Sequence, residues 1–176
     1  PIVVAINKCD LPEADPQKIK NQLLEHELIA EDLSGDTLMV EISTKTKKNL
    51  DKLIESVLLQ AELLDLKTDY EIKSNGVVLE SKIDVGRGPI VSIIVTTGTL
   101  KKGDYFVSGM QWGKVRALIN DQGSSVNFAN PSTPLEVLGI NGAAKAGDDF
   151  IVLENEKEAK ILCDARVQEN KDGKNP

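Results

Sequence analysis

The sequence predicts a chain of two structural classes, an α/β part followed by an all-β part that we expect to form a small β-barrel. Two observations carry this prediction. Up to residue 66, short apolar runs of strand length alternate with apolar residues at helical spacing. From residue 76 on, short strand-like runs are separated by glycine-rich turns. We therefore expect a partial doubly wound sheet over residues 1–66, the barrel over residues 67–160, and a linker helix that starts within residues 161–176 and ends in a polar tail.

The first part follows the order β-α-β-α. Residues 2–6 are almost wholly apolar, which is typical of a parallel strand covered on both faces. Asp15 and Pro16 suit the N-cap and the first turn of a helix, residues 38–42 form a second strand, and Asn49 is expected to cap a second helix. The apolar positions at helical spacing are Ile19, Leu23, Leu24 and Leu28, and then Leu50, Leu53, Ile54, Val57, Leu58, Ala61 and Leu64.

The second part contains six strand-like runs joined by turns. These runs cover residues 76–83, 90–97, 105–108, 114–119, 134–138 and 150–153. Residues 84–89 supply the turn between the first two runs, and glycines punctuate the later ones. Short strands at this spacing indicate a barrel or a sandwich, with Trp112 expected in its core. A helix is expected to begin within residues 154–166, followed by a polar tail.

Composition and charge narrow the classes of function. The chain is 40% hydrophobic and 28% charged, as in an ordinary globular protein, and its apolar runs are too short to span a bilayer. No signal peptide opens it, and Cys9 and Cys163 suggest neither a disulfide framework nor a metal site. Of the net charge of −7, residues 1–66 carry −6. The second part is therefore nearly neutral, which is compatible with a local basic face as well as with scattered solvated lysines.

Polar residues follow both strands of the first part. Asn7, Lys8 and Asp10 come directly after the first strand, and the turn Ser43-Thr44-Lys45 comes directly after the second. Ligands of open α/β sheets bind at the carboxyl ends of strands, so both loops are expected at the same edge of the sheet. An isolated N-K-x-D match is weak and fits a simple polar loop; the second loop is what favours a binding site.

The two loops have the chemistry to recognise guanine. The Asp10 carboxylate can accept hydrogen bonds from the ring N–H and the exocyclic amine that guanine presents side by side. Asn7 can tie the loops together, the backbone N–H of Thr44 can donate to the guanine carbonyl, and the stems of Lys8 and Lys45 can cover the base faces.

The residues of these loops resemble the fourth and fifth guanine-binding motifs of GTPases. Residues 1–166 resemble the bacterial translation initiation factor two family of translational GTPases. The residues that carry the resemblance are 35–37, 42–46, 49–53, 76–81, 86–89, 98–104, 113–117, 134–139 and 146–148. Two positions depart from the family pattern, Thr44 where alanine is usual and Cys9 where an apolar residue is usual. We expect a packing role for Cys9.

The resemblance implies a fold and a function. It implies a P-loop-GTPase-like sheet followed by a translation-factor-type barrel, in a parent protein that hydrolyses GTP with Mg²⁺, binds GTP and GDP, and promotes initiator-tRNA binding and joining of ribosomal subunits. The barrel is then expected to dock on the small ribosomal subunit and its rRNA. Arg87, Lys101 and Lys102 are the candidate contacts, the alternative being that they are solvated turn residues. A bacterial cytoplasm is the expected location, with the mitochondrial matrix as the alternative.

The catalytic half of a GTPase is missing from the sequence. No G-x-x-x-x-G-K-[ST] phosphate loop occurs, because Asp104 stands where that lysine belongs after Gly98 and Gly103. The D-x-x-G match at residues 32–35 follows the base loop instead of preceding it, so we interpret it as an ordinary loop. We expect no catalytic residue, no metal ligand and no GTP hydrolysis from this chain alone.

Three further expectations remain. The start at Pro1 suggests a cut through a nucleotide domain, and the apolar strand 2–6 would then present an edge that invites association. The alternatives to an initiation factor are an elongation-factor-type GTPase and a non-enzymatic ribosome- or RNA-binding barrel. We expect a surface position for His26.

Overall fold

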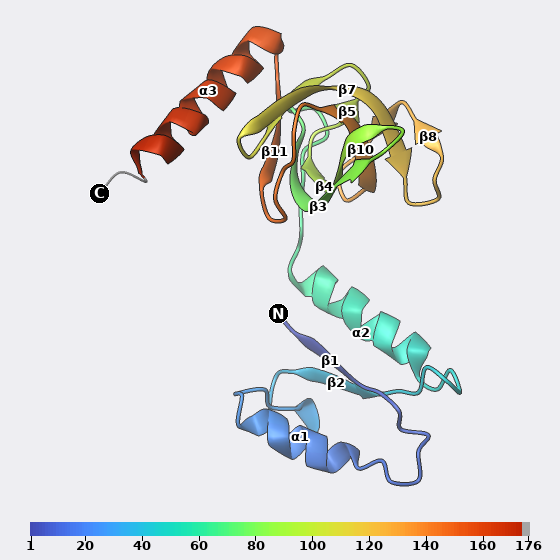
Figure 1. Cartoon of the computed structure of the whole chain (residues 1–176). Helices are drawn as coiled ribbons and strands as arrows, with labels where there is room; N and C mark the ends of the chain where they lie inside the picture. Colours follow the sequence, from blue (N-terminus) through green and yellow to red (C-terminus); the bar gives the residue numbers. More distant parts are fainter. Residues whose placement is uncertain (174–176) are drawn as a thin grey trace. The chain divides into compact units, whose positions relative to one another are not determined.

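The computed structural model describes residues 1–173 and divides into two compact units, Pro1–Lys67 and a second one from Thr68 onward. We call them unit 1 and unit 2. Figure 1 shows that unit 1 is a small α/β layer and that unit 2 is a closed β-barrel with one helix attached. The two predicted classes, α/β and then all-β, are confirmed. Within the described residues no helix is both long and apolar enough to cross a membrane.

Unit 1 is built on two parallel strands. β1 (Val3–Ile6) pairs with β2 (Leu38–Glu41), from Val3 opposite Leu38 to Ile6 opposite Glu41. The connection between them carries α1 (Pro16–Leu24) and a short 3-10 helix, η1 (Glu31–Leu33), and α2 (Leu50–Leu63) follows β2. A parallel pair requires such a crossover, which explains why the chain alternates between the two periodicities.

The starts of the two helices differ. α1 begins as predicted, with Pro16 at its start and the Asp15 carboxylate accepting a hydrogen bond from the backbone N–H of Lys18 at 3.1 Å. The predicted cap of α2 is wrong in its chemistry. Asn49 occupies the cap position with a left-handed φ of 55°, and its side-chain amide donates to the carbonyl oxygen of Glu41 at 2.8 Å. This bond ties the start of α2 to the end of β2.

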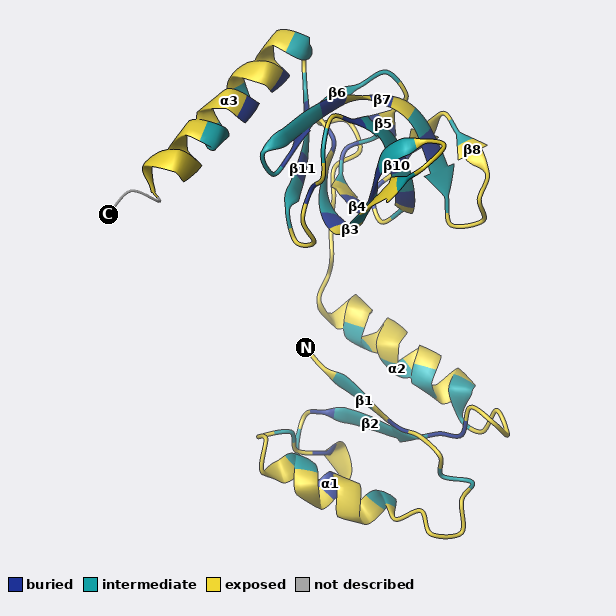
Figure 2. Ribbon diagram, in the orientation of Figure 1, coloured by how far each residue is buried: buried dark blue, intermediate teal, exposed yellow. Residues whose placement is uncertain are grey.

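The core of unit 1 is small. Its buried apolar residues are Ile6, Ala30 and Ile42, and no residue of α2 is buried. Figure 2 shows α2 almost entirely in the colours of exposed and intermediate residues. The apolar face predicted for this helix is present, but Leu58 is 62% exposed and Leu63 is 71% exposed. A two-stranded sheet offers too little surface to cover a helix of this length.

Unit 2 closes six antiparallel strands into a barrel. Their bounds are β3 (Asn75–Asp84), β4 (Gly88–Thr97), β6 (Tyr105–Ser108), β7 (Gln111–Asn120), β10 (Pro134–Ile140) and β11 (Asp149–Leu153). The order is β10-β4-β3-β11-β6-β7, and a further pairing of β10 with β7 closes the ring. Closure removes the free strand edges that an open sheet of this size would expose.

The barrel interior is packed with apolar side chains. Phe106 and Phe150 stack with their ring centroids 4.4 Å apart, and both are fully buried. Along β4, Val91, Ile93 and Val95 alternate inward and are also fully buried. Each such side chain contributes roughly 1.5–3 kcal/mol on transfer from water. The barrel therefore has the larger core of the two units.

Three two-residue strands were not predicted from the sequence. They are β5 (Leu100–Lys101), β8 (Ser125–Val126) and β9 (Phe128–Ala129), where β5 pairs with β9 and β8 pairs with β7. Segments of two residues carry no periodicity, so the sequence offers no signal for them.

The last helix is longer than predicted. α3 (Glu156–Asp172) includes most of the residues expected to form a polar tail, and residues 174–176 lie outside the described residues. Ala159 and Cys163 of α3 are buried against Val107 of β6. The Arg166 guanidinium binds both carboxylate oxygens of Asp149, at 2.8 and 2.6 Å. These contacts hold α3 to the barrel.

The prediction that Trp112 belongs to the core is wrong. Its ring lies on the outer face of β7, partly buried beside α3 in the cluster around Val107. Residues of β7 alternate sides, so the neighbours Gly113 and Val115 face the interior instead.

Candidate functional site

The two polar loops of unit 1 meet at the carboxyl ends of β1 and β2. Past the strands, the backbone N–H of Ile42 donates to the Ile6 carbonyl at 2.8 Å, and the N–H of Cys9 donates to the Ile42 carbonyl at 3.1 Å. Pairing therefore continues beyond both strands and brings the two loops side by side. Parallel pairing makes this placement unavoidable, because both strands end at the same edge.

Asn7 connects the two loops. Its side-chain oxygen accepts from the backbone N–H of Thr44 at 3.1 Å and from that of Lys8 at 2.7 Å. Its side-chain amide lies 3.4 Å from the Thr44 hydroxyl oxygen. The Thr44 N–H, which the sequence assigns to a guanine carbonyl, is thus engaged by Asn7 here.

Asp10 is held by the second loop. The hydroxyl of the fully buried Ser43 donates to Asp10 Oδ1 at 2.7 Å and also accepts from the backbone N–H of Thr46 at 3.1 Å. The Ser43 hydrogen bond, helped by the charge of Lys45, lowers the pKa of the Asp10 carboxyl below its usual value. Asp10 is therefore ionised at neutral pH, and within residues 1–173 its Oδ2 accepts no hydrogen bond from another residue.

The rim of the site is open and carries two lysines. Lys8 adopts a left-handed φ of 61°, and both Lys8 and Lys45 are exposed. A groove of about 340 Å³ runs from Asn7 and Lys8 along α1. The Cys9 thiol contacts the Ile6 carbonyl oxygen at 3.2 Å, which is a packing position. The arrangement presents one oriented carboxylate beside an amide and two flexible cations.

Asp104, in the incomplete phosphate-loop match, and Asp32, in the D-x-x-G match, are both bound within the fold. The Asp104 carboxylate accepts from the backbone N–H of Lys101 at 2.9 Å and closes the turn before β6, where burial raises its pKa. Asp32 lies 2.6 Å from the ammonium of the buried Lys20, which also reaches Glu41 at 3.3 Å. No cluster of three or more potential metal ligands is found among residues 1–173.

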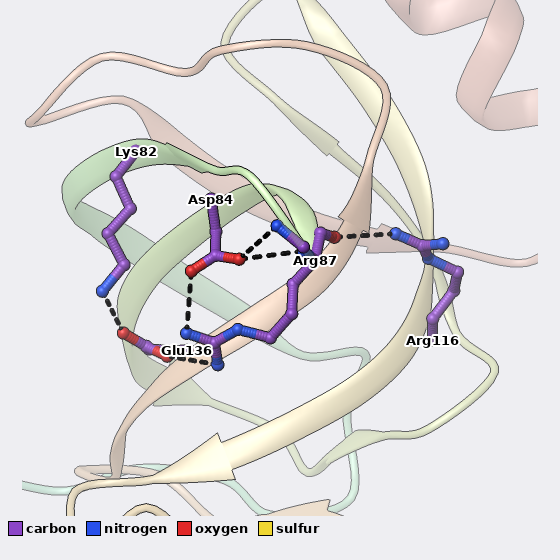
Figure 3. Close-up of polar contacts among 6 residues, drawn as sticks. Lys82, Asp84, Arg87, Arg116 and Glu136 are labelled. Carbon is purple, nitrogen blue, oxygen red and sulfur yellow. Dashed lines mark hydrogen bonds and ion pairs between the residues drawn. The ribbon is translucent and has the colours of Figure 1, made fainter.

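The barrel residues expected to contact RNA fall into two kinds. Figure 3 shows that Arg87 points back onto the barrel, where its guanidinium lies 3.3 Å from Asp84 and 3.7 Å from Glu136. Lys82 binds Glu136 at 2.5 Å, and Arg116 donates to the Arg87 carbonyl at 3.4 Å. The charge of Arg87 is thus locally compensated. Backbone amides of Arg87 and Gly86 hold the pKa of Asp84 below its usual value.

Lys101 and Lys102 differ from Arg87. Lys101 ends β5 and Lys102 begins the turn to β6; both are exposed, and within residues 1–173 neither makes an ion pair. The structure shows no hydrogen bond between Arg87 and either lysine. Glu136 lies about fifty residues from Arg87 in the sequence, and the pairing of β10 with β4 is what brings it close. No sequence signal could have shown that this charge is neutralised.

Comparisons with known proteins agree with both units. A family model described as Elongation factor G domain 2 matches residues 73–153, which cover most of the barrel. The chain is 74% identical over 176 residues to translation initiation factor IF-2 of Pelagibacter ubique, covering all of this chain and 24% of that protein. It is 53% identical over 172 residues to IF-2 of Cereibacter sphaeroides, covering 98% of this chain and 21% of that protein. The chain thus spans about a quarter of these curated relatives.

Solved structures support the fold. The crystal structure of GDP-bound aIF5B from Aeropyrum pernix aligns with a TM-score of 0.73 at 23% identity, over 97% of this chain and 37% of that one. The elongation factor SelB from Methanococcus maripaludis in its apo form aligns with a TM-score of 0.64 at 20% identity, over 89% of this chain and 34% of that one.

Proposed function

Because this chain belongs to the translation initiation factor IF-2 family, whose members match at least 98% of it while it spans about a quarter of their length, we propose that it recognises the guanine base of GTP and GDP and docks a translation factor on the ribosome. The observation that carries the first part is the junction of the two loops, where Ser43 fixes an ionised Asp10 and Asn7 joins the loops.

The residues present fit the base and do not fit the rest of the nucleotide. Asp10 Oδ2 is available to accept from guanine, and the hydrogen bond from Ser43 keeps the carboxylate oriented. For the phosphates and Mg²⁺, the described residues offer no counterpart, since Asp32 is paired with Lys20 and Asp104 closes a turn. Binding and hydrolysis of phosphates are therefore left to other parts of the parent protein.

Each loop residue has a defined task in this proposal. Asp10 accepts the two N–H donors that guanine presents together, which adenine lacks. Before guanine binds, Asn7 holds the second loop through the Thr44 N–H. A small shift of that loop exchanges this hydrogen bond for one to the guanine carbonyl, while the Asn7 amide stays beside the Thr44 hydroxyl. Lys8 and Lys45 lay their aliphatic stems against the two base faces.

Titration of the ¹⁵N-labelled chain with guanosine and with adenosine tests base recognition. Guanosine is expected to shift the amide signals of Lys8, Thr44 and Lys45 in the millimolar range, while adenosine leaves them unchanged. Asp10→Ala should abolish the guanosine response, and Asp36→Ala, an exposed carboxylate away from the loops, should retain it. Equal responses to both nucleosides would contradict the proposal. Micromolar or tighter binding of labelled GDP would contradict the weak affinity expected without a phosphate loop.

The second part of the proposal concerns the barrel. Docking on the small ribosomal subunit and its rRNA is supported by the exposed cations Lys101 and Lys102, which make no ion pair among the described residues 1–173. Arg87 has a lesser role because of its partners Asp84 and Glu136. The initiator tRNA would be bound by regions outside this chain, and subunit joining would be an activity of the parent protein. We place that protein in a bacterial cytoplasm, with the mitochondrial matrix as the alternative.

Cosedimentation of the chain with small ribosomal subunits tests the docking. Lys101→Ala with Lys102→Ala is expected to weaken binding and to flatten its dependence on salt concentration, because two phosphate contacts are lost. Unchanged affinity would remove the turn between β5 and β6 from the docking surface.

A further inference from the structure

Two aromatic side chains lie on the outer wall of the barrel instead of in its core. Tyr105 of β6 and Trp112 of β7 are both partly buried, and they share one face of the β6–β7 hairpin with Val107. Alternation along β7 puts Lys114 and Arg116 on that same face. If Tyr105 and Trp112 served only to pack against α3, cations at positions 114 and 116 of the same face would not be needed.

These residues surround a hollow. A groove of about 420 Å³ is lined by Tyr105, Trp112, Lys114, Arg116, Asn141 and Glu156, between β6, β7, the end of β10 and the first turn of α3. We call it the β6–β7 groove. The close approach of β10 is fixed by Gly139, where a Cβ would come within 1.8 Å of the Lys114 carbonyl oxygen.

The groove concentrates cations whose charge is not locally neutralised. Within residues 1–173, Lys114 and Arg116 form no ion pair, in contrast to Lys82 and Arg87 on the neighbouring hairpin. A third cation, Lys160, lies beside the groove with its ammonium 5.0 Å from the centre of the Trp112 ring.

The acid on the rim does not cancel this charge. Glu156 is bound to Lys160 at 2.6 Å, so the two charges offset each other and leave Lys114 and Arg116 in excess. Lys114 places its ammonium 5.2 Å from the centre of the Tyr105 ring. A cation thus rests on each aromatic ring, and such contacts at exposed sites are weak enough for a ligand to displace.

We propose that the β6–β7 groove binds a single-stranded RNA segment. An unpaired base stacks on Trp112 or Tyr105, while Lys114 turns from the Tyr105 ring and Arg116 from the Arg87 carbonyl to adjacent phosphates. The exposed amide of Asn141 reaches a base edge. None of Asp10, Lys101 and Lys102 lines this groove, so the proposal goes beyond the function proposed above.

The chemistry favours single-stranded RNA over the other anionic partners. A duplex keeps its bases stacked inside and cannot bring one onto an aromatic ring in a groove. An acidic peptide would use the cations but gains little from two aromatic faces. Stacking of a base uses both features of the groove, because every base has a π-face and carries a phosphate beside it.

The single tryptophan of the chain makes a direct test possible. A fluorescein-labelled ten-nucleotide oligouridine is titrated with the 176-residue chain at 50 mM KCl while anisotropy is followed, and an unlabelled oligomer is used to follow Trp112 emission. We expect saturable binding, quenching of Trp112, and about tenfold weaker binding for Trp112→Leu, with partial retention in Trp112→Phe. Tyr105→Leu provides a second variant if Trp112→Leu does not fold.

Matched double variants locate the site. Lys114→Ala with Arg116→Ala is expected to weaken oligouridine binding several-fold and to lower the slope of log affinity against log salt concentration by about 1.4. Lys101→Ala with Lys102→Ala removes the same charge from two residues that do not line the groove and should change oligouridine binding less than twofold.

Four outcomes would overturn the proposal. These are equal losses from the two double variants, unchanged Trp112 emission at saturation, binding of an RNA duplex as tight as that of the single strand, and full competition by polyglutamate. A ribosome-binding defect confined to the Lys101 and Lys102 variant bears on the docking proposal alone, so the two proposals can fail separately.

Discussion

Unit 1 and the barrel are stabilised by different kinds of interaction. Among the described residues of unit 1, three apolar side chains are buried, whereas the main cluster of the barrel contains fifteen. The candidate base site nevertheless lies in unit 1, where hydrogen bonds from Asn7 and Ser43 fix the loops. Recognition chemistry here rests on local polar contacts and parallel pairing, while the barrel rests on its packed interior. The predictions below test that difference.

The largest expected effect is a core deletion in the barrel. Phe106→Ala removes a fully buried ring that stacks on Phe150, and we expect a loss of about 3–5 kcal/mol from the free energy of unfolding of unit 2. In unit 1, Leu63→Ala changes a side chain that is 71% exposed and should cost less than about 0.5 kcal/mol. Urea unfolding followed by Trp112 fluorescence, with circular dichroism for unit 1, measures both. Similar losses would erase the contrast.

A smaller effect is expected where α3 meets the barrel. Arg166→Ala removes the paired hydrogen bonds to Asp149 and should cost about 1–2 kcal/mol, because the pair is partly exposed to solvent and to salt. The Arg166 hydrogen bond lowers the pKa of Asp149. The stabilisation is therefore fully present above the ordinary carboxyl pKa of about 3.9 and is lost as pH falls through the lower, folded pKa.

The matched control for this pair is Lys160→Ala. Lys160 also makes an ion pair on α3, with Glu156, but half of its side chain is exposed. We expect a change of less than about 0.5 kcal/mol. Acid titration of stability that looks the same in the wild type and in Arg166→Ala would show that the Asp149 pair does not matter.

In the loops of unit 1, Ser43→Ala is expected to change stability still less, and its main effect is on the pKa of Asp10. Ser43→Ala removes the hydrogen bond that is the main cause of the lowered pKa of Asp10. The pKa of Asp10, followed by ¹³C NMR of its carboxyl carbon, should rise toward its ordinary value, and guanosine binding should weaken several-fold because the carboxylate loses its orientation. Thr46→Ala, which keeps the backbone N–H bound to Ser43, is the control. An unmoved pKa would show that Ser43 does not hold Asp10.

The smallest effect concerns a compensated charge. Arg87→Ala is expected to weaken binding to small ribosomal subunits less than twofold, since Asp84 and Glu136 already neutralise that guanidinium. Removing Lys101 and Lys102 together should have the larger effect. A reversed order in cosedimentation would mean that Arg87 leaves its partners when the barrel docks.

Much of the fold could be predicted, and the reasons are physical. The parallel pair and the barrel strands follow from period and turn residues, and Asp15 caps α1 as its residue type predicts. The side chain of Asn49 binds Glu41 instead of capping α2, because the left-handed backbone at this residue points its amide back to β2. The outward position of Trp112 depends on α3, which lies about fifty residues further along the chain and covers that face of the barrel.

The candidate site, too, could be predicted only in part from the sequence. Loop positions at the ends of parallel strands can be read from the chain, so Asn7 and Ser43 were expected near each other. The partners of individual atoms could not be read, since the Thr44 N–H binds Asn7 and the Arg87 charge is neutralised across strands. Local order predicts where a site lies, whereas three-dimensional packing decides which of its donors and charges are available.

The most direct test of base recognition exchanges the hydrogen-bonding pattern of Asp10 and of the base together. Xanthine replaces the exocyclic amine of guanine by a carbonyl oxygen, which an amide can donate to and a carboxylate cannot. Asp10→Asn is therefore predicted to reverse the preference, so that the wild-type chain binds guanosine more tightly than xanthosine and the variant binds xanthosine more tightly than guanosine. An unchanged preference for guanosine in Asp10→Asn would contradict the account.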